Sequence, residues 1–109
     1  MTVNELVERL SLTPVTLPEG DREVEGVYIG DLLSWVMGRA QADNAWITIM
    51  SNLNIVAVAT LADVSCIILA EGVTLEAQVI ETALSKGINV LSSDKTAYEV
   101  AAALAGLGL

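Results

Sequence analysis

The sequence contains no histidine and only one cysteine, Cys66. Without histidine the chain lacks the commonest general base, the commonest transition-metal ligand and any Ser-His or Cys-His pair for nucleophilic catalysis. Cys66 lies in the apolar stretch VSCIIL, where a thiol is most often a small buried hydrophobic group. A single cysteine also excludes a disulfide within the chain. We therefore predict no catalytic residue, no metal site and no cofactor.

Basic residues are scarce as well, with five lysines and arginines against 14 aspartates and glutamates and a formal net charge of −9. Nucleic acids and anionic lipid surfaces bind clustered lysine and arginine, so we expect neither as a partner. The densest acidic stretch is EGDREVE at 19–25. Its alternation is more typical of an exposed turn leading into a strand than of a metal site.

No apolar run approaches the roughly 20 residues that span a bilayer, and IVAVA at 55–59 is one of the longer ones. The first residues show no basic-then-apolar signal segment. We expect a cytoplasmic protein without membrane contact. The 109 residues fit one domain, and an apolar content of 53% is rich for so short a chain, which favours an oligomer interface.

The apolar pattern alternates between helical and strand periods. Helices are predicted over 3–12, from a cap at Asp31 to about Ala42, and over 51–62, 75–86 and 94–107; extended segments are predicted at 15–17, 24–30, 45–50, 64–69 and 88–92. This alternation indicates an α/β fold with three layers, α/β/α, around a mostly parallel sheet of four to five strands. The first short strand pairs antiparallel at an edge in this prediction, and the β-branched run at 64–69 is central.

Residues 24–104 resemble a DRTGG domain, the small α/β module related to the N-terminal domain of HPr kinase/phosphorylase that also occurs inside some phosphotransacetylases. The likeness lies in GVYIGDLL, AWITIMSNLNIVAVATL and the segment from VSCIIL to AYEVAAAL. The last third fits best: a strand ending in a glycine turn, a helix, a short strand, and Asp94-Lys95-Thr96 opening the final helix. The family's Asp-Arg is Asn52-Leu53 here, and its Thr-Gly-Gly is Ala70-Glu71-Gly72.

The resemblance implies a divergent, stand-alone DRTGG member with the fold of the HPr kinase N-terminal domain. It implies one domain over 1–109, with a helix and edge strand in 1–20 and a core over 24–107. It implies a regulatory role and no activity, because the catalytic phosphate-binding loop of HPr kinase lies in another domain. No G-x-x-x-x-G-K-[ST] occurs in this chain.

Ligands of open parallel sheets bind beyond the carboxyl ends of the strands. The turns predicted there supply the candidate ligand- or partner-binding residues: Asp31, Ser51, Asn52, Glu71, Gly72, Thr74, Ser92, Ser93, Asp94 and Thr96. Helix capping is the competing interpretation for most of them, with Asp31, Thr74 and Asp94 as N-caps and the serines as hydroxyls at helix starts. Glu71 replaces a small residue in a tight turn, where it caps, faces solvent, or contacts an amine or a partner's arginine.

The charges at these turns predict which ligands are rejected. A helix N-terminus stabilises a nearby exposed anion by ~0.3–1 kcal/mol. A carboxylate a few ångströms from a phosphate repels it by roughly 1–4 kcal/mol. Because Asp31, Glu71 and Asp94 are opposed by Lys95 alone in this prediction, the site is expected to reject phosphate.

Two further features favour a homodimer. Trp35 lies off the apolar stripe of its helix one turn before Arg39, so the pair forms a cation–π contact or Trp35 anchors an interface. Residues 51–62 are apolar around most of the helix, which indicates burial on two sides, and the tail ALAGLGL is apolar.

The leading hypothesis is a non-catalytic regulatory or protein-interaction module that binds a partner protein, such as a larger redox or phosphotransfer enzyme encoded separately, or a small ligand. The alternative is a small carboxylate- or metal-dependent enzyme or transferase using Asp31, Glu71 and Asp94 in the strand-end loops.

Overall fold

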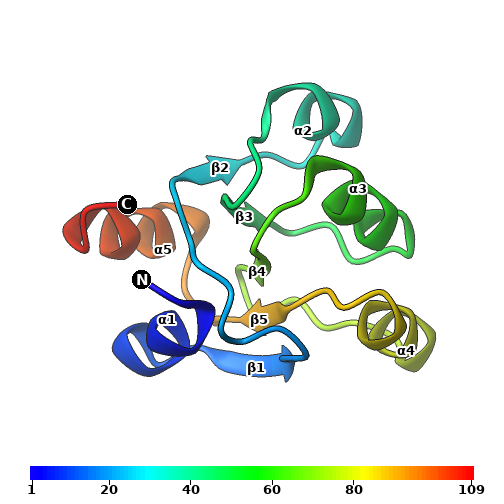
Figure 1. Ribbon diagram of the computed structural model, residues 1–109, viewed down its shortest axis with the longest axis horizontal. Coiled ribbons are helices and arrows are strands. Elements are labelled where there is room, and N and C mark those ends of the chain that lie inside the picture. Colours follow the sequence, from blue (N-terminus) through cyan, green and yellow to red (C-terminus); the bar gives the residue numbers. More distant parts are fainter.

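From β2 onward strands and helices alternate along the chain, and the elements stack in three layers (Figure 1). The computed structural model describes all residues, 1–109. In chain order the elements are α1 (Val3–Leu10), β1 (Thr13–Thr16), β2 (Val27–Ile29), α2 (Leu33–Arg39), β3 (Ala45–Thr48), α3 (Asn54–Ala62), β4 (Cys66–Leu69), α4 (Ala77–Ser85), β5 (Val90–Ser92) and α5 (Ala97–Gly106). The predicted α/β fold is confirmed.

The sheet has five strands in the order β1-β5-β4-β3-β2. Strands β2 to β5 are parallel, and β1 pairs antiparallel with β5 at one edge. The apolar, β-branched strand β4 lies in the centre and is buried throughout, as such a run predicts. The first strand begins two residues earlier than expected and contains Pro14, which an edge strand tolerates because it needs fewer backbone donors.

Two apolar cores lie on opposite faces of the sheet. Helices α1 and α5 cover one face, and α2, α3 and α4 cover the other (Figure 1). Successive strand residues alternate between these cores, so Ile47 and Ile68 pack under α1 and α5 while Trp46 and Ile67 pack under the other three helices. Burial of each such side chain stabilises the fold by about 1.5–3 kcal/mol.

Helix α2 is shorter and less buried than predicted. It ends at Arg39 instead of Ala42, and of its residues only Val36 is fully buried. Leu32, just before the helix, and Met37 within it are about half exposed. The reason is the position of the helix: it packs beside β2, the last strand at its edge, so the sheet does not extend far enough to cover its whole apolar side.

The three predicted N-caps are wrong. Asp31 does not cap α2, whose N-cap is Leu32, and Thr74 does not cap α4, which begins after Glu76. Asp94 does not cap α5 either, because Thr96 forms a capping box with Glu99 and satisfies the first backbone donors itself.

The start of α3 and the end of α4 agree better with the helix boundaries predicted from the sequence. Ser51 makes no capping hydrogen bond, but the Asn52 side chain accepts a hydrogen bond from the backbone N–H of Asn54 at 2.9 Å, just where α3 begins. Gly87 follows α4 with a φ of +71°, as a glycine that ends a helix commonly does. No helix has the combination of length and apolar character that a bilayer-crossing segment needs.

The edge formed by the amino ends of the strands is closed by a polar network that the sequence did not reveal. Arg22, from the acidic segment 19–25, donates to the carboxylates of Asp43 at 3.0 Å and Asp63 at 2.8 Å. The buried Asn89 side chain donates to the backbone carbonyls of Glu19 and Ser65, at 2.9 Å each. Every buried side-chain polar atom in the chain has a hydrogen-bond partner.

Candidate functional site

The carboxyl ends of β2, β3, β4 and β5 meet at the opposite edge of the sheet, as parallel strands require. The predicted site residues lie in the turns that follow these strands. The structure does not gather them into one site: six of them line two cavities, and Asp31, Glu71, Gly72 and Thr96 line neither.

Asp31 is held in the turn after β2 by neighbouring β3. Its carboxylate accepts hydrogen bonds from the Thr48 hydroxyl at 2.8 Å and from the backbone N–H of Ile49 at 3.0 Å. The carbonyl of Gly30 accepts a hydrogen bond from the indole N–H of Trp46 at 2.9 Å. These bonds give Asp31 a structural function in place of the predicted helix cap.

The turn at 70–73 has both of its central residues in the left-handed region, with φ of +61° at Glu71 and +70° at Gly72. The N–H of Val73 donates to the carbonyl of Ala70 at 3.2 Å, which closes a type I′ turn. The Glu71 side chain is exposed, as one of the three interpretations proposed.

The same turn is tied to the loop after β5. The N–H of Glu71 donates to the carbonyl of Lys95 at 2.8 Å, and the N–H of Gly72 donates to the carbonyl of Ser93 at 2.9 Å. A Cβ on Gly72 would lie only 3.1 Å from a carboxylate oxygen of Asp94. Because both backbone donors are used within the protein, this turn is not a phosphate cradle.

The first cavity, which we call the β3–β4 cavity, lies between the turns after β3 and β4. Ser51, Asn52 and Thr74 come together in its wall, and its volume is about 610 Å³. The one charged side chain that lines it is Glu76. The expected rejection of phosphate stays a prediction for this cavity. The negative charge of Glu76 favours such a rejection.

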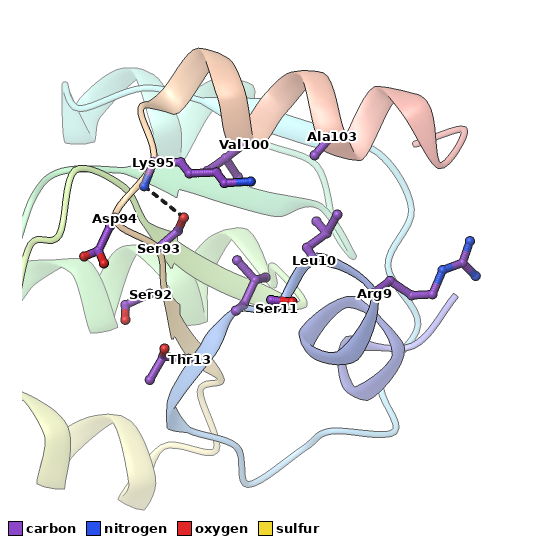
Figure 2. A pocket seen from close by; sticks show the side chains of 11 residues that line it. Arg9, Leu10, Ser11, Thr13, Ser92, Ser93, Asp94, Lys95, Val100 and Ala103 are labelled. Atoms are coloured by element: carbon purple, nitrogen blue, oxygen red, sulfur yellow. Dashed lines mark hydrogen bonds between the residues drawn. The ribbon is translucent and has the colours of Figure 1, made fainter.

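The second cavity, which we call the α1–β5 cavity, has a volume of about 400 Å³ and contains the predicted residues Ser92, Ser93 and Asp94 (Figure 2). Lys95 also lines it, together with Arg9 and Ser11 from the end of α1, which sequence reasoning did not place here. The antiparallel pairing of β1 with β5 brings these residues to the carboxyl end of β5. The strand order that does so leaves no local signal in the sequence.

The remaining predicted residues lie outside both cavities. Thr96 is engaged in its capping box with Glu99. Trp35 and Arg39 are on α2, at the β2 edge, and the guanidinium carbon of Arg39 lies 3.8 Å from the centre of the Trp35 ring, which confirms the cation–π contact.

Two observations bear on nucleophilic and metal-dependent chemistry in this chain. Burial raises the pKa of the Cys66 thiol to about 12, so no thiolate forms near neutral pH. No group of three or more acidic, cysteine or histidine side chains lies close enough together to hold a metal ion. The alternative of a carboxylate- or metal-dependent enzyme stays a hypothesis.

Comparisons with known proteins give one matching family and one similar solved structure. The sequence model of one family, described as DRTGG domain, matches residues 5–107. No curated protein sequence matches the chain. A solved structure of the CBS and DRTGG domains of the regulatory region of Clostridium perfringens pyrophosphatase, complexed with the activator diadenosine tetraphosphate, is similar with a TM-score of 0.74 and 16% sequence identity. The likeness covers 94% of this chain and 45% of that one, so this chain spans less than half of its length.

Proposed function

The chain belongs to the DRTGG domain family, and from this premise we propose that it is a non-catalytic regulatory module that acts by docking on another protein chain, in the first place on a second copy of itself. The similar pyrophosphatase structure is a regulatory region that binds a nucleotide activator. That precedent supports regulation through binding. A larger redox or phosphotransfer enzyme as a further partner stays a prediction.

Exposed apolar side chains at one edge of the sheet are the observation behind this proposal. Three large apolar residues with exposed fractions between 49% and 57% come from β2, the turn after it and α2: Ile29, Leu32 and Trp35. We call them the β2-edge surface. Small soluble proteins seldom leave so much apolar area near one edge uncovered unless another chain covers it.

The strand at this edge offers backbone groups as well. β2 pairs with β3 on one side, and its other side has no strand partner. Such an edge readily pairs with a further strand. A second copy that presents its own β2 antiparallel would satisfy these groups and bury both copies of Leu32 and Trp35 in one symmetric contact. Arg39, stacked on Trp35, already restricts the ring before docking, which lowers the entropic cost of burying it.

Light scattering coupled to size exclusion tests the self-docking. We expect twice the mass of the chain at tens of micromolar, and a monomer for Leu32→Glu and for Trp35→Glu, because each places an unpaired carboxylate in the contact. Leu84→Glu is the matched control, since Leu84 is about as exposed but lies on α4. A mass equal to one chain at every concentration would refute the dimer, and loss of the dimer in Leu84→Glu alone would place the contact elsewhere.

A further inference from the structure

We propose that the α1–β5 cavity binds a small organic anion, whose carboxylate or phosphate group is held by Lys95, Arg9 and the hydroxyls of Ser11 and Ser93. The cavity lies beside β1 and β5, at the opposite edge of the sheet from the β2-edge surface. The proposal is therefore independent of the proposed docking function.

The distribution of the five basic residues is the first observation. Arg22 is paired with Asp43 and Asp63, and Arg39 is stacked on Trp35. Lys86, at the end of α4, lines a separate surface hollow. Arg9 and Lys95 form no ion pair within the chain, and both line the α1–β5 cavity. Two unpaired cations in one cavity of so acidic a protein repel each other, and an anion between them removes that repulsion.

The direction of the side chains is the second observation. Figure 2 shows Ser93 and Lys95 on the side of the β5 turn that faces Leu10, Ser11 and Val100, whereas Asp94 points the other way. The Asp94 carboxylate lies against Gly72, as the 3.1 Å approach described above shows. Arg9 lies at the rim with its guanidinium turned outward (Figure 2), so its long side chain has to rotate to contact a bound anion.

Of the acids near these two cations, Asp94 lines the cavity with its carboxylate turned toward Gly72, and the others are at the periphery. Glu5 is close enough to Arg9, and Glu99 to Lys95, for each cation to lower the carboxylate's pKa slightly, but neither acid lines the cavity. Asp31 is held at the end of β3, two strands from β5. With strands about 4.8 Å apart, that is roughly a Debye length at physiological salt, so Asp31 is largely screened. The phosphate rejection expected for the whole strand-end edge does not extend to this cavity, because Arg9 joins Lys95 there.

Free donors are the third observation. At the edge formed by the amino ends of the strands, hydroxyls already donate hydrogen bonds within the protein. Thr16, for example, donates to the carbonyl of Ile88 at 2.7 Å. Ser11 makes no side-chain hydrogen bond. The Ser93 hydroxyl oxygen accepts one from the N–H of Lys95 at 3.1 Å and keeps its own hydrogen to donate. Both hydroxyls are thus available to an oxyanion.

The size and walls of the cavity restrict the ligand further. A volume of about 400 Å³ falls within the range of small-molecule sites, roughly 300–1,000 Å³, and exceeds what an inorganic ion fills. Leu10, Val100 and Ala103 form an apolar wall beside the polar groups. A compact organic anion with a short hydrocarbon part fits both.

NMR titration of the full ¹⁵N-labelled chain tests the site with succinate, glycerol 3-phosphate, inorganic phosphate and, as a neutral control, glycerol. We expect saturable shifts at the amides of Ser11, Ser93 and Lys95 with at least one of the two organic anions, weaker binding of inorganic phosphate and none of glycerol. Comparison of succinate with glycerol 3-phosphate decides between carboxylate and phosphate.

Charge-removing variants complete the test. Lys95→Gln and Arg9→Gln should each raise the observed dissociation constant about tenfold, because each removes a charge-assisted hydrogen bond. Lys86→Gln, a cation outside the cavity, should leave it unchanged. The spectrum of each variant shows directly that it is folded. Absence of saturation up to roughly 10 mM, too weak for a specific site, or shifts centred on Ser51 and Thr74 of the β3–β4 cavity, would overturn the proposal.

Discussion

At the scale of single residues, Glu71 shows how backbone geometry explains a sequence signature. Both central positions of its turn have positive φ, +61° and +70°, a conformation that glycine adopts without steric cost. The family's Thr-Gly-Gly, aligned with Ala70-Glu71-Gly72, puts glycine at both positions. The chain keeps the glycine at 72, where a Cβ would lie only 3.1 Å from Asp94, and accepts a strained residue at 71, where the side chain reaches solvent.

Replacing Glu71 by glycine should therefore not destabilise the protein. An L-residue in the left-handed region costs roughly 1–2 kcal/mol, and the greater freedom of glycine in the unfolded chain offsets about 0.5–1 kcal/mol of that. We expect Glu71→Gly to raise the free energy of unfolding by up to about 1 kcal/mol, measured by urea denaturation followed by circular dichroism. Glu81→Gly, an exposed position inside α4, should lower it by about 1 kcal/mol. Equal destabilisation by both substitutions would show that Glu71 makes a stabilising contact.

Single residues were also the hardest to predict. The sequence showed Asp31 and Asp94 before helices, which is typical of N-caps, but another residue competes with each of them. Thr48 on a neighbouring strand binds Asp31, and Thr96, two residues later, takes the cap from Asp94. Arg9 belongs to a cavity because of the register of β1 against β5. Tertiary contacts decided the cases of Asp31 and Arg9, which leave no local pattern, whereas Thr96 with Glu99 is a local Thr-x-x-Glu capping box that the sequence does contain.

At the scale of elements, α1 and α5 begin with the same capping motif. Thr2 with Glu5, and Thr96 with Glu99, form capping boxes in which the threonine oxygen accepts from the glutamate N–H at 3.2 Å and the carboxylate accepts from the threonine N–H at 3.1 Å. These bonds favour the charged carboxylate, so the pKa values of both glutamates are lowered from 4.5.

The caps predict a pH-dependent part of the stability. A carboxyl whose pKa is lower in the folded than in the unfolded state contributes stability that is present above the unfolded pKa, about 4.5, and is lost as the pH falls through the folded pKa. The double variant Glu5→Gln/Glu99→Gln should melt below the parent at pH 7, and the gap in Tm should close on acidification below about pH 4. The difference between the two curves cancels the other carboxylates. A difference in Tm that stays constant with pH would mean that the shape of the glutamate side chain, not its charge, stabilises these caps.

The elements themselves were largely predictable. All ten appear in the expected order, and the apolar run at 64–69 correctly indicated the central strand. Most observed boundaries are shorter, as at β2, predicted over 24–30 and observed at Val27–Ile29. Strand ends depend on which neighbour supplies the hydrogen bonds, and a period of two in one strand does not identify that neighbour.

At the scale of the whole molecule, layer architecture followed from the alternation of periods, whereas strand order did not. The order decides that β2 is an open edge, that α2 is half covered, and that α1 ends beside β5. Both proposed binding regions depend on it: the β2-edge surface at one end of the sheet and the α1–β5 cavity at the other. Sequence reasoning therefore found residue types suited to binding without finding the two places where they gather.

Net charge makes the proposed dimer depend on salt in a direction opposite to that of an ion-paired interface. The molecule measures 32 × 26 × 25 Å and carries a charge of −9. At 0.01 M ionic strength the Debye length is about 30 Å, so two copies repel through nearly all their charges; at 0.15 M it is about 8 Å and only charges near the contact matter. Because the β2-edge surface is apolar, screening removes more repulsion than attraction.

We therefore expect the dimer dissociation constant to fall as sodium chloride rises from about 0.01 to 0.15 M, measured by sedimentation equilibrium. Trp35→Glu should sediment as a monomer at both concentrations, which separates this effect from nonspecific association. A dissociation constant that rises with salt would show that opposite charges, with Arg39 as the nearest cation, hold the two copies together, and the apolar edge would then not be the main source of affinity.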